Sequence, residues 1–252
     1  MVAVVPAPPL MVPQLTVGGA EESVAMRRAC LDVVTRLGAG AARWLVLGAD
    51  SVGAGAPVAE SPVAGSPGRR TVVAPGYGTF LGYGVDVRVS LTPDPSGEPC
   101  GDLPLPVLIA GWLRGQTCAH VRATAELVDP ELGTADCQRL GERLAAGVEP
   151  GTGLLVVGDG ATTHTDKAPG YLDQRAGPFD AAVARALAAA DPDGLLALDA
   201  ELGAELNVVG RAPWQVLAGA ALAAGPGWSG ELRYSDAPYG VGYHVAFWRR
   251  NR

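Results

Sequence analysis

Lysine is almost absent from this chain of 252 residues, which holds one, Lys167, and whose arginines are scattered. The formal net charge is −7 and the pI is about 5.0. A surface that binds nucleic acid needs clustered Lys and Arg to contact phosphates, so we expect no nucleic-acid partner. Abundant alanine beside so little lysine indicates a GC-rich, bacterial genome.

We also expect no cysteine metal knuckle, no secretory leader and no membrane-spanning segment. No two of the four cysteines have the C-x-x-C spacing of a metal knuckle. The opening MVAVVPAPPLMVP has no basic region and is broken by prolines, unlike a secretory signal. The most apolar stretch, residues 212–225, is shorter than a membrane span. We therefore expect a cytoplasmic protein with free thiols and no membrane partner.

Two groups of sequence motifs are absent as well. GTGLLVVGDG does not give G-x-G-x-x-G, and no G-x-x-x-x-G-K-[ST] phosphate loop occurs. No G-x-S-x-G elbow marks a serine nucleophile. A hydrophobic share of 48% still supplies a globular core, while 35 Gly and 21 Pro predict turn-rich loops.

Apolar runs alternate with amphipathic stretches, which favours an α/β fold. Residues 2–5 and 43–47 are typical of buried strands, and residues 21–37 predict a helix between them with Gly38 as its C-cap. We predict one α/β domain over residues 1–252, with a central mixed β-sheet flanked by helices. Further strands are predicted at 85–91, 118–127, 154–157, 231–235 and 241–248, the last two as a hairpin, and further helices at 103–113, 135–146, 179–190, 194–206 and 213–224.

Two other stretches have loop composition. Residues 49–70 are rich in Ser, Pro and Gly and predict a mobile loop. Residues 74–84, APGYGTFLGYG, fit either a flexible rim of a pocket or an ordinary turn-rich connection. If they form a rim, residues 77–83 should lie near the site predicted next.

The segment GDGATTHTDKAPGYLDQRAGPFD, residues 158–180, is the main candidate site. It follows the apolar run LLVV, and ligands of open α/β sheets bind at the carboxyl ends of strands. His164 in this segment could act as a general base, as a ligand, or as a loop residue bonded to a carbonyl. Asp159, Asp166 and Asp173 could orient its ring, or could simply form turns.

The same segment carries candidate ligand-binding residues. Lys167 beside a base suits an anionic substrate, and the alternative is a surface ion pair. We take Asp159, Lys167, Tyr171 and Arg175 as the candidate ligand-binding residues. The other two histidines, His120 and His244, lie in predicted strands, and their spacing does not show that they converge on His164.

Three stretches carry a resemblance to a known family: GDGATTHTDKAPGYLDQRAGPFDAAV, LLALDAELGAELNVVGRAPWQVLAGA and SDAPYGVGYHVAFW. They resemble, in order, a strand end with a catalytic His, a helix pair and a closing hairpin of the class III extradiol dioxygenase superfamily. This is the LigB-type group, which also includes the Memo-like proteins. The resemblance spans most of the chain, and it implies a LigB-like α/β fold.

In that family two His and one carboxylate hold Fe(II), and a further His acts as acid and base while O2 opens a catechol ring. The resemblance gives His164 the acid/base position. It places the three metal-ligand positions on Ala7, near Asp50 and near Val208, of which only Asp50 could bind a metal. No His precedes His120, so the family's two amino-terminal histidine ligands are missing under any alignment.

The resemblance therefore implies a LigB-like protein with degenerate metal ligands. It would bind a small anionic or aromatic ligand, or a partner protein, without the usual Fe(II) chemistry and without a cofactor. The alternative is a divergent Fe(II)-dependent extradiol dioxygenase that uses His164 as acid and base. Metal-free acid/base chemistry at His164 is a third hypothesis, and a homo-oligomer is left open.

Overall fold

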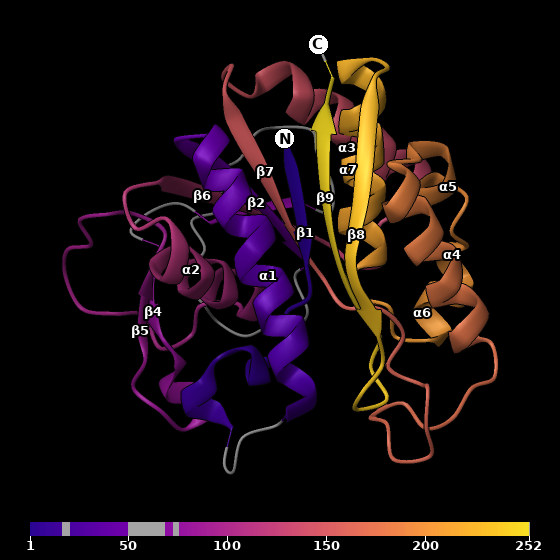
Figure 1. Ribbon diagram of the computed structural model, residues 1–252, viewed down its shortest axis with the longest axis horizontal. Coiled ribbons are helices and arrows are strands. Elements are labelled where there is room, and N and C mark those ends of the chain that lie inside the picture. Colours follow the sequence, from indigo (N-terminus) through magenta and orange to yellow (C-terminus); the bar gives the residue numbers. More distant parts are fainter. Residues whose placement is uncertain (17–20, 50–68, 73–75, 252) are drawn as a thin grey trace.

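The protein is built around a mixed seven-stranded sheet of order β3-β6-β2-β7-β1-β9-β8 (Figure 1). The computed structural model describes residues 1–16, 21–49, 69–72 and 76–251. The four central strands β6, β2, β7 and β1 are parallel, and β3, β9 and β8 each run antiparallel to a neighbour. The strands of this sheet are β1 (Val2–Val5), β2 (Arg43–Ala49), β3 (Arg69–Val72), β6 (Arg122–Val128), β7 (Thr152–Val157), β8 (Trp228–Asp236) and β9 (Tyr243–Arg250).

Helices cover both faces of the sheet, with α1 and α2 on one face and α3 to α7 on the other (Figure 1). A separate two-stranded sheet, β4 (Tyr77–Thr79) with β5 (Arg88–Ser90), lies beside α2. The helices are α1 (Glu21–Gly40), α2 (Leu105–Thr117), α3 (Thr134–Gly147), α4 (Ala176–Ala189), α5 (Pro192–Leu196), α6 (Ala200–Glu205) and α7 (Arg211–Ala224), and three 3-10 turns cover Pro9–Met11, Pro13–Leu15 and Phe80–Tyr83.

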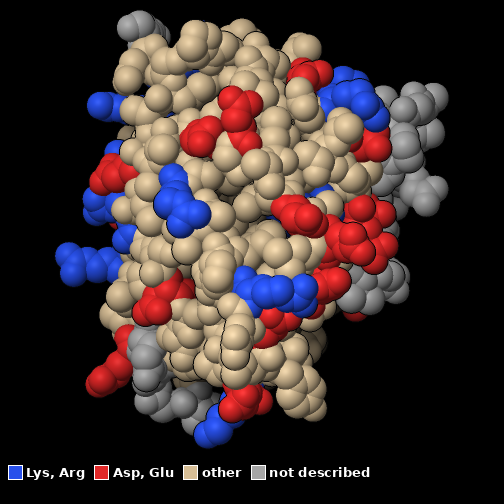
Figure 2. Space-filling view, turned by 90° about the vertical axis from the view of Figure 1, so that its right-hand side faces the viewer, with Lys and Arg blue, Asp and Glu red and all other residues tan. Residues whose placement is uncertain are grey.

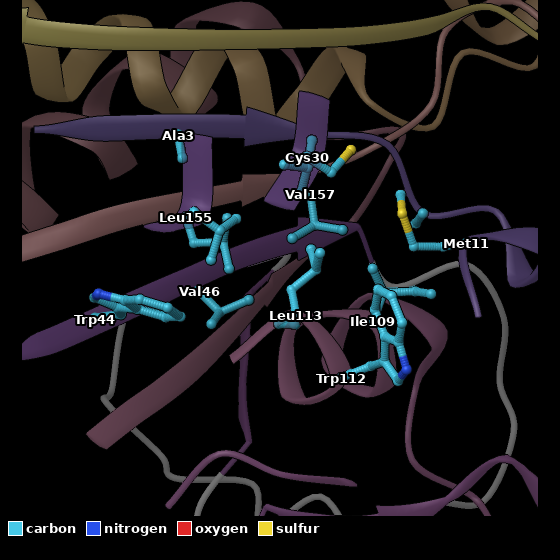
Figure 3. Close-up of a cluster of buried hydrophobic side chains, with 14 of the residues drawn as sticks. Ala3, Met11, Cys30, Trp44, Val46, Ile109, Trp112, Leu113, Leu155 and Val157 are labelled. Carbon is cyan, nitrogen blue, oxygen red and sulfur yellow. The ribbon is translucent and has the colours of Figure 1, made fainter. Parts of the chain in front are cut away.

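Alternation along the strands sends side chains to two separate cores. In β2, Trp44 and Val46 face α1 and α2, whereas Leu45 and Leu47 face α3 and α7. This is the two-residue period of an extended chain whose two faces are both covered. We call the core under α1 and α2 the first core and the core under α3 to α7 the second core. Figure 3 shows the first core, where side chains of the sheet such as Val46 and Leu155 meet those of α2.

The predicted fold class, α/β with a central mixed sheet flanked by helices, is confirmed. The predicted β-loop-α-β opening corresponds to β1, α1 and β2, and the predicted closing hairpin to β8 and β9. The predicted strand at 85–91 is shorter, because β5 (Arg88–Ser90) pairs only with β4. Residues 50–68 of the predicted mobile loop lie outside the described residues, and Arg69 already begins β3.

Two helix boundaries differ from the prediction. Helix α1 continues past Gly38 to Gly40, and Gly38 is needed for packing: a Cβ there would lie 2.1 Å from Cys118 Sγ. The predicted helix over residues 194–206 is broken into α5 and α6. The break follows from capping, because the Asp199 side chain accepts the N–H of Leu202 and starts a new helix.

The four cysteines are free thiols. Among the described residues no helix combines the length and apolar character needed to cross a bilayer. Figure 2 shows the side of the molecule that carries α4, α5, α6 and β8, where Lys and Arg lie interspersed with Asp and Glu.

Candidate active site

The segment after β7 hydrogen-bonds to the residues that lead into β9. This pairing places His164 at the end of the sheet where the parallel strands finish. The Gly160 N–H donates to the Gly242 carbonyl (2.7 Å), and the Gly242 N–H donates to the Ala161 carbonyl (2.8 Å). The His164 N–H donates to the Gly240 carbonyl (3.2 Å). Because β9 is antiparallel to β1, its first residues lie at the carboxyl ends of the parallel strands β1 and β7. His164 therefore lies where open α/β sheets bind ligands.

The carboxylate of Asp180 lies between two histidines. Its Oδ2 is 2.6 Å from His164 Nε2, and its Oδ1 is 3.4 Å from His244 Nε2. Asp180 is in the first turns of α4, and the apolar side chain of Phe179 beside it packs into the second core. The side chain of His164 is 18% exposed, whereas those of Asp180 and His244 are 8% and 2% exposed. Only His164 of the three is accessible to a ligand.

The hydrogen bonds of Asp180 fix how His164 carries its proton. Both carboxylate oxygens accept the backbone N–H of Ala161 (3.2 Å each), and an ionised carboxylate can only accept hydrogen bonds. Nε2 of His164 is therefore the nitrogen that bears the proton and donates it to Asp180. Nδ1 has no hydrogen-bond partner in the described part of the chain, so it is left for a bound molecule.

Two glycines make room for the Asp180 carboxylate. A Cβ on Gly160 would lie 2.5 Å from Asp180 Oδ1, and a Cβ on Gly242 would lie 1.9 Å from Asp180 Oδ2. Neither distance is compatible with a side chain unless the carboxylate moves. The glycines of GDGA and YGVG therefore let the backbone approach Asp180 closely.

Asp159 is a second acid at the carboxyl end of β7. Burial raises its pKa to about 7, the N–H of Ala7 opposes this by donating to Oδ1 (2.7 Å), and the negative charge of Asp180 raises the pKa further. The pair of acids thus contains one group that titrates near neutral pH and one that holds a histidine. Such unequal environments are typical of acid/base sites.

Two of the three positions that the family resemblance assigns to metal ligands, Ala7 and Val208, lie near Asp159, and neither side chain has a donor atom. Ala7 contacts Asp159 through its backbone, and the Gly210 N–H, two residues after Val208, donates to the Asp159 carbonyl (2.9 Å). Ala7 and Val208 are buried aliphatic side chains without donor atoms. Asp50 lies outside the described residues.

The described residues do not fit the Fe(II) centre that the resemblance implies. Fe(II) in such centres is held by two His and one carboxylate with open positions for substrate. Within residues 1–16, 21–49, 69–72 and 76–251, no group of three or more His, Cys, Asp and Glu is arranged to hold a metal ion.

The third histidine lies at the other end of the sheet. His120 is exposed and precedes β6, whose first residue Arg122 pairs with Arg43, the first residue of β2. Arg43 also pairs with Thr152, the first residue of β7. His164 follows the opposite end of β7, and a six-residue strand spans about 20 Å. His120 therefore takes no part in the site.

The predicted ligand-binding residues divide into two groups. Lys167 follows His164 by three residues in the chain and is exposed. It lines a surface hollow together with Tyr239. Tyr171 is 77% exposed at a backbone φ of 62°. Arg175 forms ion pairs with Asp173 (2.7 Å) and Glu205 (2.6 Å), which raise the pKa of its guanidinium. Asp159 thus lies close enough to Asp180 to feel its charge, whereas Arg175 is held by Asp173 and Glu205.

Asp180 and its contact with His244 were not foreseen from the sequence. The carboxylate that holds the ring of His164 is Asp180 rather than Asp159, Asp166 or Asp173. A signal existed in the paired glycines Gly160 and Gly242, since such residues mark a close approach of backbone to another group. The rim predicted at 77–83 is not part of the site, because β4 lies far from the segment after β7 (Figure 1).

Comparisons with known proteins give no functional assignment. No protein-family model matches the sequence, and no curated protein matches it. Among solved structures, the chain is similar to the crystal structure of the uncharacterized protein JW3007 from Escherichia coli K12. The two share 16% sequence identity with a TM-score of 0.48, over 98% of each chain.

Proposed function

We propose that this protein binds a small aromatic or anionic molecule beside His164 and exchanges a proton with it, without the Fe(II) centre of the extradiol dioxygenases. The observation that carries the proposal is the hydrogen bond of 2.6 Å between His164 Nε2 and the buried carboxylate of Asp180. A histidine whose one nitrogen is held by a carboxylate presents the other to substrate in a fixed orientation.

The chemistry follows from the two nitrogens of His164. Nδ1 takes a proton from an acidic group of the bound molecule, such as a phenol, and the imidazolium that results is stabilised by Asp180. The proton returns to the ligand or a product from the same nitrogen. Asp159, with a pKa of about 7, is a second group that can exchange a proton near neutral pH.

The ligand class rests on the surroundings of His164. Lys167 and Tyr239 line a surface hollow together with Asp166 and with Thr165, which follows His164 in the chain, and an ammonium stabilises an anionic group on a ligand. An aromatic ring can pack against Tyr239. Catechol and benzoate are therefore the probes of choice, one a phenol with acidic protons and the other an aromatic anion.

Binding can be followed through the histidines themselves, since the chain has only three. We expect catechol or benzoate to shift the ring resonances of His164 in a 1H–13C spectrum and to leave those of His120 unchanged. His164→Ala should fold and lose the binding, whereas His120→Ala, which changes an exposed residue at the other end of the sheet, should keep it. Shifts at His120 alone, or none with either probe, would refute the proposal.

The dioxygenase alternative is tested on the same protein. The chain is reconstituted anaerobically with Fe(II), freed of loose metal and analysed for bound iron, and O2 uptake is then measured with catechol. The proposal expects neither stoichiometric iron nor O2 uptake. One iron per chain together with O2 uptake would establish the alternative and end the proposal.

A further inference from the structure

A hollow between α7, the end of α3 and the sheet, called the α7 hollow below, lies at the opposite end of β7 from His164. Its volume is about 390 Å³, within the range of about 300–1,000 Å³ that is typical of small-molecule sites. Thr152 and Leu154 at the start of β7 line it, whereas His164 follows the end of that strand. A six-residue strand spans about 20 Å. The α7 hollow is therefore separate from the candidate active site.

The floor of the α7 hollow is a row of aliphatic side chains on three neighbouring strands. Leu45, Leu154 and Val2 pair in register across β2, β7 and β1, and all three face the second core. The end of α3 adds Leu144 and Val148 to the lining. Because apolar surface is more stable away from water, such a lining favours the apolar part of a ligand.

Alanines of α7 leave this floor uncovered. Val216, Ala220 and Ala224 line the hollow at a spacing of four residues, which puts side chains on one face of a helix. The two alanine side chains end at Cβ, so the space that larger residues would fill between α7 and the sheet stays open. Packed interiors leave few voids larger than a water molecule, and an apolar cavity accepts an apolar guest in preference to water.

Arg250 places a cation at the rim of the α7 hollow. It lies opposite Trp228 in the β8–β9 ladder, and both side chains line the hollow. Its Nε donates to the Pro226 carbonyl (3.1 Å), which holds the guanidinium beside the end of α7. Glu149 also lines the hollow, but its charge is balanced by an ion pair with Arg43 (2.6 Å). A guanidinium binds a carboxylate through two parallel hydrogen bonds.

We propose that the α7 hollow binds a medium-chain fatty acid, with its alkyl chain between α7 and the sheet and its carboxylate at Arg250. The aliphatic floor and the alanines of α7 match the chain, and the guanidinium complements the charge of the head group. An alkyl chain can also bend to follow an irregular lining. The site uses neither His164 nor Asp180, so it goes beyond the proposed function.

Titration calorimetry with octanoate, decanoate and decylamine tests the site on the unchanged protein. From octanoate to decanoate the affinity should rise about fourfold per methylene, the effect of burying that group. Decylamine, which reverses the charge of the head group, should bind less tightly than decanoate. The proposal is overturned if decanoate shows no saturable binding, if it binds no more tightly than octanoate, or if decylamine binds equally well.

Two pairs of variants locate the bound chain and its head group. Arg250→Gln should lower the affinity for decanoate about three- to fivefold, the effect of an ion pair at an exposed rim. Arg249→Gln, an exposed change on the opposite face of β9, should leave it unchanged. Ala220→Phe fills the hollow and should abolish binding. Ala223→Phe, which changes an exposed alanine of α7 outside the lining, should keep it.

Equal affinities of Arg250→Gln and Arg249→Gln would overturn the proposal, and so would a folded Ala220→Phe protein that binds as tightly as Ala223→Phe. If Ala220→Phe does not fold, the arginine pair decides alone. Decanoate should leave the ring resonances of His164 unchanged, and a shift there would place it in the candidate active site instead. Failure of catechol or benzoate to bind leaves all of these results unaffected.

Discussion

Asp180 and Gly242 are so close that a methyl group on Gly242 would lie 1.9 Å from Asp180 Oδ2, the oxygen that accepts from His164. The glycine belongs to the segment that leads into β9, and the aspartate belongs to α4. Two parts of the chain more than 60 residues apart thus set the position of one carboxylate. The geometry of the candidate site therefore depends on a residue that has no functional group.

Gly242→Ala should displace Asp180 from His164. Crowding of a packed interior costs about 1–3 kcal/mol of unfolding free energy, and we expect the ring resonances of His164 to shift at the same time. Urea unfolding and a histidine NMR spectrum measure the two effects. Gly177→Ala in α4 is the control, because nothing lies within 4 Å of the added Cβ. A Gly242→Ala protein with unchanged stability and an unchanged His164 spectrum would contradict the packing described.

Asp159 should make the protein less stable as the pH rises. Its pKa is about 7 in the folded protein against 3.8 as its ordinary value, so the folded state holds a proton that the unfolded state has lost. Stability then falls between about pH 4 and pH 7. At about 1.4 kcal/mol for each pKa unit, the loss is about 4 kcal/mol at most.

Asp159→Asn removes this titration while keeping an oxygen for the Ala7 N–H. We expect its free energy of unfolding to decline less steeply from pH 4 to pH 7 than that of the unchanged protein. Urea unfolding at several pH values gives the comparison, with Asp193→Asn in α5 as an exposed control. Parallel curves for the unchanged protein and Asp159→Asn would show that Asp159 has an ordinary pKa.

Arg211 should contribute more to stability than any surface arginine. It is 2% exposed, and its guanidinium donates to the carbonyls of Leu132 and Pro130 and to Gln215 Oε1. Arg211→Met leaves these acceptors unsatisfied and should cost about 3 kcal/mol or more. Arg139→Met is the matched change, since Arg139 forms an exposed pair with Asp136 and should cost less than about 1 kcal/mol. Similar midpoints in urea for the two variants would refute this ranking.

The packing of α3 on α7 should depend on Gly141. A Cβ there would lie 2.1 Å from the Val216 carbonyl oxygen, which belongs to the backbone and cannot rotate away. We expect Gly141→Ala to lower the unfolding free energy by about 1–3 kcal/mol. Gly147→Ala, at the end of the same helix with open space around it, should leave stability unchanged or raise it by up to about 1 kcal/mol. Thermal unfolding of both variants measures the difference in stability. Equal melting temperatures for Gly141→Ala and Gly147→Ala would contradict the close approach of α3 and α7.

The sequence located the candidate site but not its chemistry. His164 could be placed at a strand end because an apolar run precedes it and a polar, glycine-rich segment surrounds it. Its carboxylate partner could not, because Asp159, Asp166, Asp173 and Asp180 all lie within 16 residues of His164 in the sequence. The choice among them depends on the direction of α4 and on the backbone pairing between residues 160–164 and 240–242.

Local pattern determined the α/β class, the order of the main strands and helices, and the lack of any histidine before His120. Those properties follow from periodicity and residue type, which act over a few neighbouring residues. Tertiary structure alone decided that Asp180 meets His164 and His244, that His120 lies at the far end of the sheet, and that Gly38 packs instead of ending a helix. Contacts of this kind join residues distant in the chain, and the close packing of the whole interior fixes which of them form.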